Sequence, residues 1–229
     1  MKQLLSGLKH CHNRGVLHCD IKGSDLLLDN EGILKIVDFG LASTFNPDHK
    51  QSMTSKVVTL WYRPPEFLLG ATYYGIGVDL WSAGCILREL LSGKPILPGR
   101  TEVEQLNKIF KLCGSPGEKY WKKAKLRHAT MFKMNQAYKR CAAETFKDFS
   151  PSALLLIETL LAVDPAKRGT ATAALNSEFF STELYDATAL SSKQRTRCDI
   201  EGREGSKAKK ERCERKSPRQ KESSSARPS

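Results

Sequence analysis

The chain has 229 residues, of which 40% are hydrophobic and 27% are charged, close to the average usage of globular proteins. This composition excludes a collagen-like or wholly disordered chain, and the lack of any run of about 18 uncharged apolar residues argues against a membrane-spanning helix. The net charge of +12 is concentrated in residues 193–229, where thirteen Lys and Arg stand against six Asp and Glu. The first residues also lack the apolar run of a signal peptide, so we expect a protein inside the cell.

The first part of the chain is predicted to form one helix and several short strands. Residues 1–14 carry apolar side chains at helical spacing, and Gly15 ends the pattern. Apolar pieces typical of strands follow at 16–17, 26–28 and 33–37, and the turn sequence DNEG joins the last two. Residues 41–78 are rich in Pro and Gly, which predicts mostly loop.

Helices dominate the rest of the prediction. Residues 78–91 are apolar nearly all round, which indicates a buried helix, and residues 102–112 are amphipathic. A polar, irregular stretch covers 113–150, and further helices are expected at 153–163 and 170–176. The fold class is therefore mainly α with a few short β-strands. From about residue 191 the chain is too poor in apolar residues to fold, so residues 191–229 are predicted to be a disordered basic tail.

Residues 18–38 contain the side chains that best suit phosphate chemistry. Asp20, Lys22 and Asp25 lie between two predicted strands in the sequence HCDIKGSD, and Asp38 follows the next strand in the sequence DFG. Mg²⁺ prefers carboxylate oxygens together with the phosphates of a substrate. A transferring phosphoryl group also needs its developing charge neutralised and its acceptor hydroxyl held in line. The pattern predicts a site for a divalent metal and a phosphate.

Several longer motifs in the same order resemble the C-terminal lobe of a eukaryotic Ser/Thr protein kinase. They read HCD at 18–20, Asp25, DFG at 38–40 and PPE at 64–66. The sequences VVTLWYRPPE and GVDLWSAGCIL resemble the cyclin-dependent branch, and in particular the plant group related to RNA polymerase II C-terminal-domain kinases. Several motifs in order are far more specific than one short pattern.

The resemblance divides the chain into functional segments. It implies a kinase domain at 1–182 that consists of the C-terminal lobe only, part of an α+β kinase fold. Within it lie a catalytic loop at 18–25, an activation segment at 38–66 and an insert at 113–150. Because only seventeen residues precede His18, with neither a glycine-rich loop nor a phosphate-pairing lysine, we expect the N-terminal lobe to be missing.

The resemblance also implies roles for single residues. Asp20 corresponds to the catalytic base, and Lys22 to the lysine that steadies the transferring phosphate, with Thr59 as its hydrogen-bond partner. Asp25 and Asp38 would hold Mg²⁺. Binding of ATP would involve Lys22, Asp25, Leu27 and Asp38.

Further residues are expected to regulate, recognise substrate or support the fold. Thr54 corresponds to the activating phosphorylation site, and the substrate residues would be Val58, Thr59 and Arg63. A buried ion pair is expected between Glu66 and Arg168, and Asp79 is expected to brace the catalytic loop from its helix.

Two positions depart from the family pattern. Cys19 stands where the family has an Arg that pairs with the phosphorylated activation threonine, so that phosphate would find fewer cationic partners. Asp25 stands where the family has Asn, and it adds negative charge beside Asp20 and Asp38. We expect metal binding to survive with altered affinity.

The implied function is a proline-directed Ser/Thr kinase that uses ATP and Mg²⁺ and acts on proteins with Ser-Pro or Thr-Pro sites, in transcription or cell-cycle regulation. The resemblance implies a cyclin as partner, although much of its surface would belong to the N-terminal lobe, and a location in the nucleus or otherwise the cytoplasm. A non-catalytic, pseudokinase-like interaction module is the alternative. A weaker third hypothesis is nucleic-acid binding through the basic tail.

Overall fold

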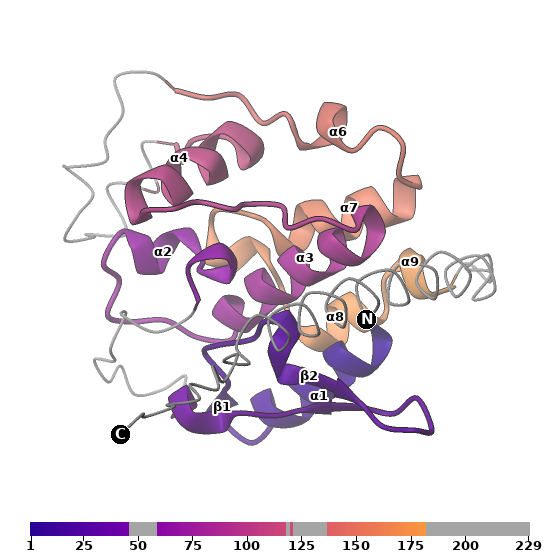
Figure 1. Ribbon diagram of the computed structural model, residues 1–229. Coiled ribbons are helices and arrows are strands. Elements are labelled where there is room, and N and C mark those ends of the chain that lie inside the picture. The colour runs from indigo at the N-terminus through magenta and orange to yellow at the C-terminus, as the bar shows by residue number, and fades with distance from the viewer. Residues whose placement is uncertain (46–58, 118–119, 121–136, 182–229) are drawn as a thin grey trace, which may run out of the picture. The chain divides into compact units, whose positions relative to one another are not determined.

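The computed structural model describes residues 1–45, 59–117, 120 and 137–181, all within one compact unit, Met1–Ser181 (Figure 1). Its helices are α1 (Lys2–His12), α2 (Pro65–Leu68), α3 (Gly77–Ser92), α4 (Glu102–Cys113), α6 (Ala142–Thr145), α7 (Pro151–Leu160), α8 (Ala171–Leu175) and α9 (Glu178–Ser181). The strands are β1 (Val16–Leu17), β2 (Leu26–Leu28), β3 (Leu34–Ile36) and β4 (Ser43–Thr44). Single 3-10 turns lie at η1 (Gly23–Asp25), η2 (Phe39–Leu41), η3 (Leu60–Tyr62) and η4 (Pro165–Lys167). The mainly α fold class with short strands is confirmed.

The predicted N-terminal helix and strands form, and they frame the loop that follows them. α1 buries Leu4, Leu5 and Leu8, and it packs against α8. Gly15 then takes a left-handed backbone conformation with φ 68°, which favours glycine and turns the chain into β1. β1 pairs antiparallel with β4. This pairing brings the segment after residue 38 back beside the segment before residue 18.

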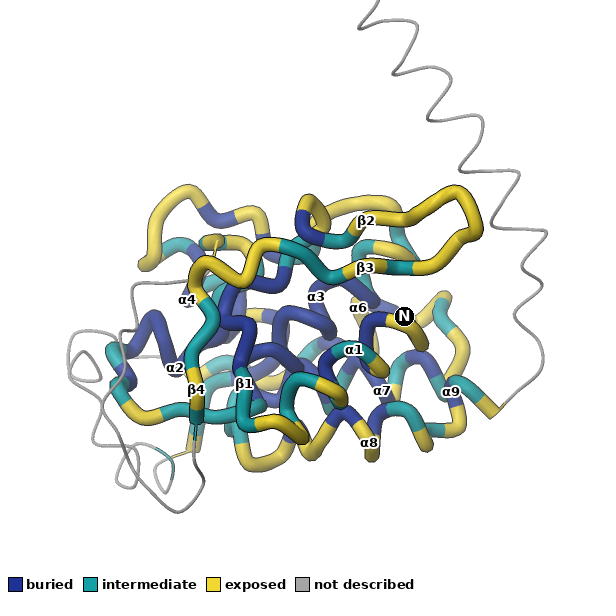
Figure 2. Tube along the Cα trace, turned by 90° about the horizontal axis from the view of Figure 1, so that it is seen from below, coloured by how far each residue is buried: buried dark blue, intermediate teal, exposed yellow. Residues whose placement is uncertain are grey.

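The second strand pair is the predicted hairpin. β2 and β3 pair antiparallel, with Leu26 opposite Ile36 and Leu28 opposite Leu34. The Asp29 carboxylate accepts hydrogen bonds from the backbone N–H groups of residues 31 and 33, which closes the turn. Much of the hairpin is exposed to solvent (Figure 2). The hairpin places its two ends, residues 25 and 37, next to each other.

The core is built around α3. Its residues 77–87 are all buried, whereas the last turn is partly open and Leu90 is 45% exposed. The prediction of a buried helix at 78–91 therefore holds for the first three turns. α3 packs closely on α7, because a Cβ at Gly84 would lie 2.8 Å from Leu160 Cβ. Gly93, with φ 69°, ends the helix.

The later helices differ from the prediction at their ends. α4 forms as expected, but α7 begins at Pro151 behind a Ser150 cap and ends at Leu160 rather than 163. Beyond this end the carbonyls of Ala162 and Val163 accept hydrogen bonds from Arg168. α6 within the predicted irregular stretch, and α9 after the predicted last helix, are additional short helices.

Within the described part of the chain no helix is both long and apolar enough to cross a bilayer. The predicted basic tail, residues 191–229, lies outside the described residues, as do parts of the predicted activation segment and insert.

Candidate functional site

The loop that carries Asp20 is fixed by a carboxylate from α3. Asp79 is almost fully buried, and its Oδ2 and Oδ1 accept the backbone N–H groups of His18 at 3.0 Å and Cys19 at 2.9 Å. Cys19 has φ 64°, a conformation that is uncommon for residues with a side chain. The geometry confirms Asp79 as the brace of this loop, because its two hydrogen bonds compensate a strained turn.

The same loop is tied to the segment that precedes Asp38. His18 is buried, and its Nε2 lies 3.0 Å from the carbonyl oxygen of Val37. Its ring contacts the Phe39 ring edge-on, with the ring centroids 4.7 Å apart. In addition, the N–H of Val37 donates to the carbonyl of Asp25 at 3.0 Å. The side chain of His18 and the backbones of residues 25 and 37 are thereby held together, which brings the HCD and DFG motifs to one place in the fold.

Lys22 lies between two carboxylates. Its Nζ donates to Asp20 Oδ2 and lies 3.1 Å from Asp25 Oδ2. The hydrogen bond to Asp20, followed by the contact with Asp25, raises the pKa of Lys22 above its ordinary value of 10.5 despite partial burial. A cation thus sits between the predicted base and a predicted metal ligand, where it would also attract the phosphate oxygens of a substrate.

Thr59 lies on the opposite side of Asp20. Its backbone N–H and its Oγ1 both donate to Asp20 Oδ1, at 2.8 and 3.2 Å. The expected hydrogen bond between Thr59 and Lys22 is therefore replaced by bonds to Asp20, which both residues share. Asp20 is oriented from two sides, with one oxygen facing Lys22 and the other facing the segment that contains Thr59.

The two predicted metal ligands differ in their surroundings. Asp25 Oδ2 is buried and is ion-paired with the Lys22 ammonium at 3.1 Å, while its Oδ1 accepts a hydrogen bond from the Ser24 hydroxyl at 2.9 Å. Asp38 is exposed, and its Oδ1 accepts the N–H of Gly40 at 3.3 Å. The described residues hold no group of three or more His, Cys, Asp and Glu arranged to bind a metal. A Mg²⁺ ion that takes substrate phosphates and water as further ligands would use the exposed Asp38 carboxylate and would compete with Lys22 for Asp25 Oδ2.

Cys19 is an apolar filler of the loop rather than a reactive thiol. It packs with Leu17, Phe67 and Val78, and it shares a side-chain hydrogen bond with Tyr74. Burial, with a smaller contribution from the nearby Asp79 charge, raises its pKa to about 12. The thiol is therefore protonated at neutral pH, and the family's arginine is replaced here by a small buried side chain.

The expected ion pair between the PPE motif and the segment after α7 is present. Arg168 Nη1 and Nη2 donate to the two carboxylate oxygens of Glu66 at 2.6 and 2.7 Å, and both side chains are buried. Arg168 also donates to the carbonyls of Gly77 and Ala162, and its guanidinium lies over the Trp81 ring at 4.9 Å. This cluster fixes the end of the predicted activation segment to α3.

The remaining predicted residues are scattered or undescribed. Leu27 is on β2 with an exposed side chain, and Arg63 pairs with Glu102 of α4 at 2.5 Å. Thr54 and Val58 lie outside the described residues, so their predicted roles remain predictions.

Two contributing side chains were not predicted. His12, at the end of α1, lies 2.9 Å from Asp79 Oδ2. Gln105 of α4 is buried and bonds to the backbone of residues 61 and 99. The signal is the same for both: Gln105 is a polar residue on the apolar face of the predicted helix 102–112, and His12 continues the helical spacing of Leu4 and Leu8 in the predicted helix 1–14.

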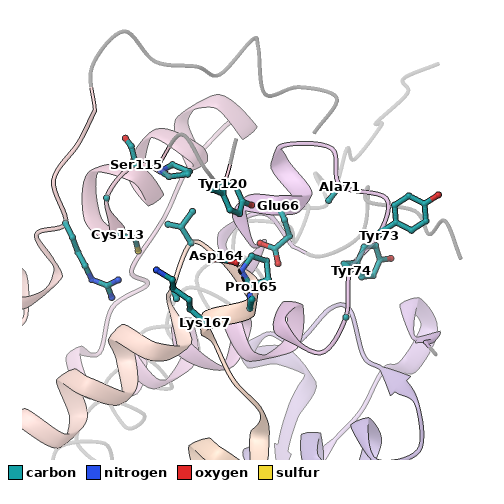
Figure 3. Close-up of a pocket in the computed structure, with 18 residues that line it drawn as sticks. Glu66, Ala71, Tyr73, Tyr74, Cys113, Ser115, Tyr120, Asp164, Pro165 and Lys167 are labelled. Carbon is teal, nitrogen blue, oxygen red and sulfur yellow. Dashed lines mark hydrogen bonds between the residues drawn. The ribbon is translucent and has the colours of Figure 1, made fainter. Parts of the chain in front are cut away.

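A separate pocket of about 730 Å³ is lined in part by the loop after α2 (Figure 3). Tyr73 and Tyr74 come from that loop, Ser115 follows α4, and Lys167 belongs to η4. It contains none of the predicted catalytic residues. It is linked to the catalytic loop through the Tyr74–Cys19 hydrogen bond.

Comparison with known proteins gives a consistent result. A probable serine/threonine-protein kinase of Arabidopsis thaliana is 67% identical over 185 residues, 81% of this chain and 32% of that protein. Cyclin-dependent kinase C-1 of Oryza sativa subsp. japonica is 56% identical over 79% of this chain and 35% of its own length. The chain thus spans about a third of the length of these relatives.

A solved structure agrees with the sequence relatives. A chain from the crystal structure of the yeast RNA Pol II CTD kinase CTDK-1 complex has a TM-score of 0.75 and 43% identity, over 80% of this chain and 61% of that chain. The profile of the protein kinase domain matches residues 1–180, and from this match we conclude that the chain belongs to the protein kinase family.

Proposed function

We propose that this chain is the C-terminal lobe of a cyclin-dependent-kinase-like Ser/Thr kinase, which transfers the γ-phosphate of ATP to Ser-Pro or Thr-Pro sites of proteins. The relatives named as Ser/Thr kinases and cyclin-dependent kinases C support the class of reaction. A cyclin partner and a nuclear location in transcription or cell-cycle control are parts of the same proposal.

The observation that carries the proposal is the shared position of Asp20 between Lys22 and Thr59. One Asp20 oxygen accepts from Lys22 and the other accepts from Thr59. A substrate hydroxyl that approaches from the Thr59 side would meet a carboxylate held ready to accept or orient its proton. Lys22 would then neutralise charge on the phosphoryl group beside the same carboxylate.

Asp25 and Asp38 supply the donors for Mg²⁺. Asp25 offers a buried oxygen that is ion-paired with Lys22, and Asp38 offers an exposed carboxylate on the neighbouring segment. The metal would neutralise phosphate charge when it is bound with ATP. In its absence, Lys22 partly balances Asp25, so we expect the Lys22–Asp25 contact to loosen when the metal is added.

The substrate side of the site would be formed by the segment around Thr59. Thr59 touches Asp20, and Arg63 is fixed by Glu102 at the start of α4. Recognition of the proline that follows the target residue is proposed to involve Val58, Thr59 and Arg63. ATP would additionally meet Leu27, whose exposed side chain lies on β2, one residue after Leu26 at the base of the hairpin.

The test is phosphate transfer from γ-labelled ATP to a Ser-Pro peptide by the full chain with Mg²⁺. Asp20→Asn and Asp38→Ala are each expected to lower transfer by about a hundredfold or more. Asp29→Asn is the matched control, because it neutralises an aspartate of the hairpin turn outside the site. Transfer that is equal in all four proteins, or that vanishes in the control alone, would refute the assignment of the site.

A non-catalytic interaction module is the second candidate. The pocket of about 730 Å³ favours it, together with large apolar side chains that are open to solvent, such as Leu28 at 69% exposure. This function predicts capture of a protein partner that the double variant Asp20→Asn/Asp38→Ala leaves unchanged. Partner capture with no phosphate transfer by the unsubstituted chain would favour this candidate over the kinase.

A further inference from the structure

Gln105 occupies an unusual position on α4. Its side chain is 0% exposed, and it lies on the same helix face as the buried Leu106 and Ile109. An amide buried among apolar side chains is destabilising unless its donor and its acceptor both find partners. The partners of Gln105 therefore show which part of the molecule it holds.

Both ends of the amide bond to backbone outside α4. Oε1 accepts the N–H of Gly99 at 3.0 Å, and Nε2 donates to the carbonyl of Trp61 at 3.3 Å. Trp61 completes a ring of three hydrogen bonds, because its Nε1 donates to the carbonyl of Gly99 at 2.9 Å. Three residues that are far apart in the sequence thus form one closed unit, which we call the glutamine clamp: Trp61, Gly99 and Gln105.

The clamp depends on close approach at residue 99. A Cβ there would lie 2.5 Å from Gln105 Oε1 and 2.8 Å from the backbone N and Cα of Gln105. Contacts of that length with backbone atoms are not relieved by a side-chain rotation. Position 99 therefore requires glycine, independently of any preference for an unusual backbone conformation.

The clamp joins α4 to the segment that touches Asp20. Trp61 and Thr59 belong to one tight turn, in which the N–H of Tyr62 donates to the carbonyl of Thr59 at 3.0 Å. Thr59 at the start of the turn bonds to Asp20, and Trp61 in its middle bonds to Gly99 and Gln105. A shift of the turn away from α4 would therefore change the position of Thr59 relative to Asp20.

The turn also presents side chains to solvent. Trp61 is 41% exposed even though its indole N–H is bonded, so one part of its ring is open to a docking chain. Arg63 is held by Glu102 in the first turn of α4. α4 therefore holds this segment at two points, by a buried amide and by a partly exposed ion pair.

We propose that Gln105 is a positioning residue for protein substrate: through Gly99 and Trp61 it fixes the 59–63 segment against Asp20. The substrate part of this inference rests on the proposed function, whereas the link from Gln105 to the backbone of residue 61 does not. Gln105 itself reaches no reacting group.

The experiment compares Gln105→Leu with Gln3→Leu in the full chain. Gln3 is a matched control, because its amide likewise joins two backbone groups, those of Gly32 and Leu34 in the hairpin. Hydrogen exchange is measured at the amides of Tyr62 and Arg63, and affinity for a fluorescein-labelled Ser-Pro peptide is measured by anisotropy. We expect at least about tenfold faster exchange and at least about tenfold weaker peptide binding in Gln105→Leu only, because the substitution removes both hydrogen bonds of the buried amide.

A conservative variant separates positioning from packing. Gln105→Glu keeps the side-chain size, and its protonated form can donate to Trp61 while it still accepts from Gly99. Burial favours the neutral form of such a carboxyl. We therefore expect the protection of amides 62 and 63 against hydrogen exchange to recover as the pH falls. The rates are corrected for intrinsic exchange and compared with those of the unsubstituted chain at each pH. Protection in Gln105→Glu that stays as weak at low pH as in Gln105→Leu would contradict the clamp, because the neutral acid can make both hydrogen bonds again.

The two readouts distinguish the possible failures. Unchanged exchange in Gln105→Leu, or the same increase in Gln3→Leu, would refute the clamp. Faster exchange with undiminished peptide affinity would refute its role in positioning substrate. If the unsubstituted chain neither binds the peptide nor transfers phosphate to it, the proposed function fails and the substrate part of this inference fails with it, while exchange still decides whether the clamp exists.

Discussion

Arg168→Met is the substitution for which the structure predicts the largest loss of stability. It removes a guanidinium that donates to both oxygens of Glu66 and to the carbonyls of Gly77 and Ala162. The Glu66 carboxylate would then stay buried without a counter-charge. Removal of one partner from a buried ion pair costs about 3–5 kcal/mol, a large part of the roughly 5–15 kcal/mol that stabilise a typical domain.

The measurement is urea unfolding of the full chain, followed by circular dichroism. Arg140→Met is the matched control, because Arg140 also pairs with a glutamate, Glu158 at 3.1 Å, and also donates to a backbone carbonyl, but with both partners about one-third exposed. Partly exposed pairs contribute about 1 kcal/mol or less. The expected difference between the two variants is therefore about 2–4 kcal/mol in the free energy of unfolding.

A double variant tests the cause of the loss. In Glu66→Leu/Arg168→Met both charges are gone, so we expect a smaller loss than the sum of the two single variants. The reasoning is refuted if Arg168→Met loses no more than Arg140→Met. It is also refuted if the two single losses simply add, since the buried, unpaired charge would then not be the cause.

Three further predictions concern the catalytic loop. Asp79→Asn turns one acceptor oxygen into an amide donor that faces other N–H groups. We expect it to lower the free energy of unfolding, measured in urea, by about 2–4 kcal/mol. A decrease below about 0.5 kcal/mol would contradict the role of Asp79 as the brace. Lys22 should titrate above 10.5 by ¹³C NMR, and Asp20→Asn should lower that pKa. Because the folded pKa is raised, the ion pair stabilises fully below pH 10.5 and is lost as the pH rises through the folded pKa; an unchanged pKa in the variant would contradict the pairing. Iodoacetamide at pH 8 should modify Cys141 well before Cys19, as measured by peptide mass spectrometry. A thiol with a pKa of about 12, such as that of Cys19, is thiolate at this pH in only about one molecule in ten thousand. Equal rates of modification would exclude burial of Cys19.

Sequence patterns predicted the positions of the helices and strands better than they predicted the contacts between these elements. The hairpin at 26–36 could be predicted because its turn residues and its strands are adjacent in the chain. The end of α7 at Leu160 could not, because Leu161 and Ala162 are apolar and buried although they lie beyond the helix. An apolar pattern reports burial, and burial continues here after the helix has ended.

The candidate site shows the same division. Asp20, Lys22 and Asp25 were identified because they are close in sequence and carry the chemistry of the reaction. The hydrogen-bond partner of Thr59 was predicted wrongly. Lys22 and Asp20 both lie within reach of one loop, and only the fold decides which of the two bonds to Thr59. A threonine hydroxyl can bond to either group, so its residue type alone holds no answer.

The buried polar residues explain how irregular segments at the site hold their shape. A loop cannot satisfy its own backbone N–H and C=O groups, so neighbouring elements must supply partners. Asp79 of α3 does this for residues 18 and 19, Gln105 of α4 for residues 61 and 99, and Arg168 for the segment after α7. Each is a polar side chain in an otherwise apolar environment. If this reasoning is right, substitutions at these three positions will change the exchange of distant loop amides more than they change the exchange of their own neighbours.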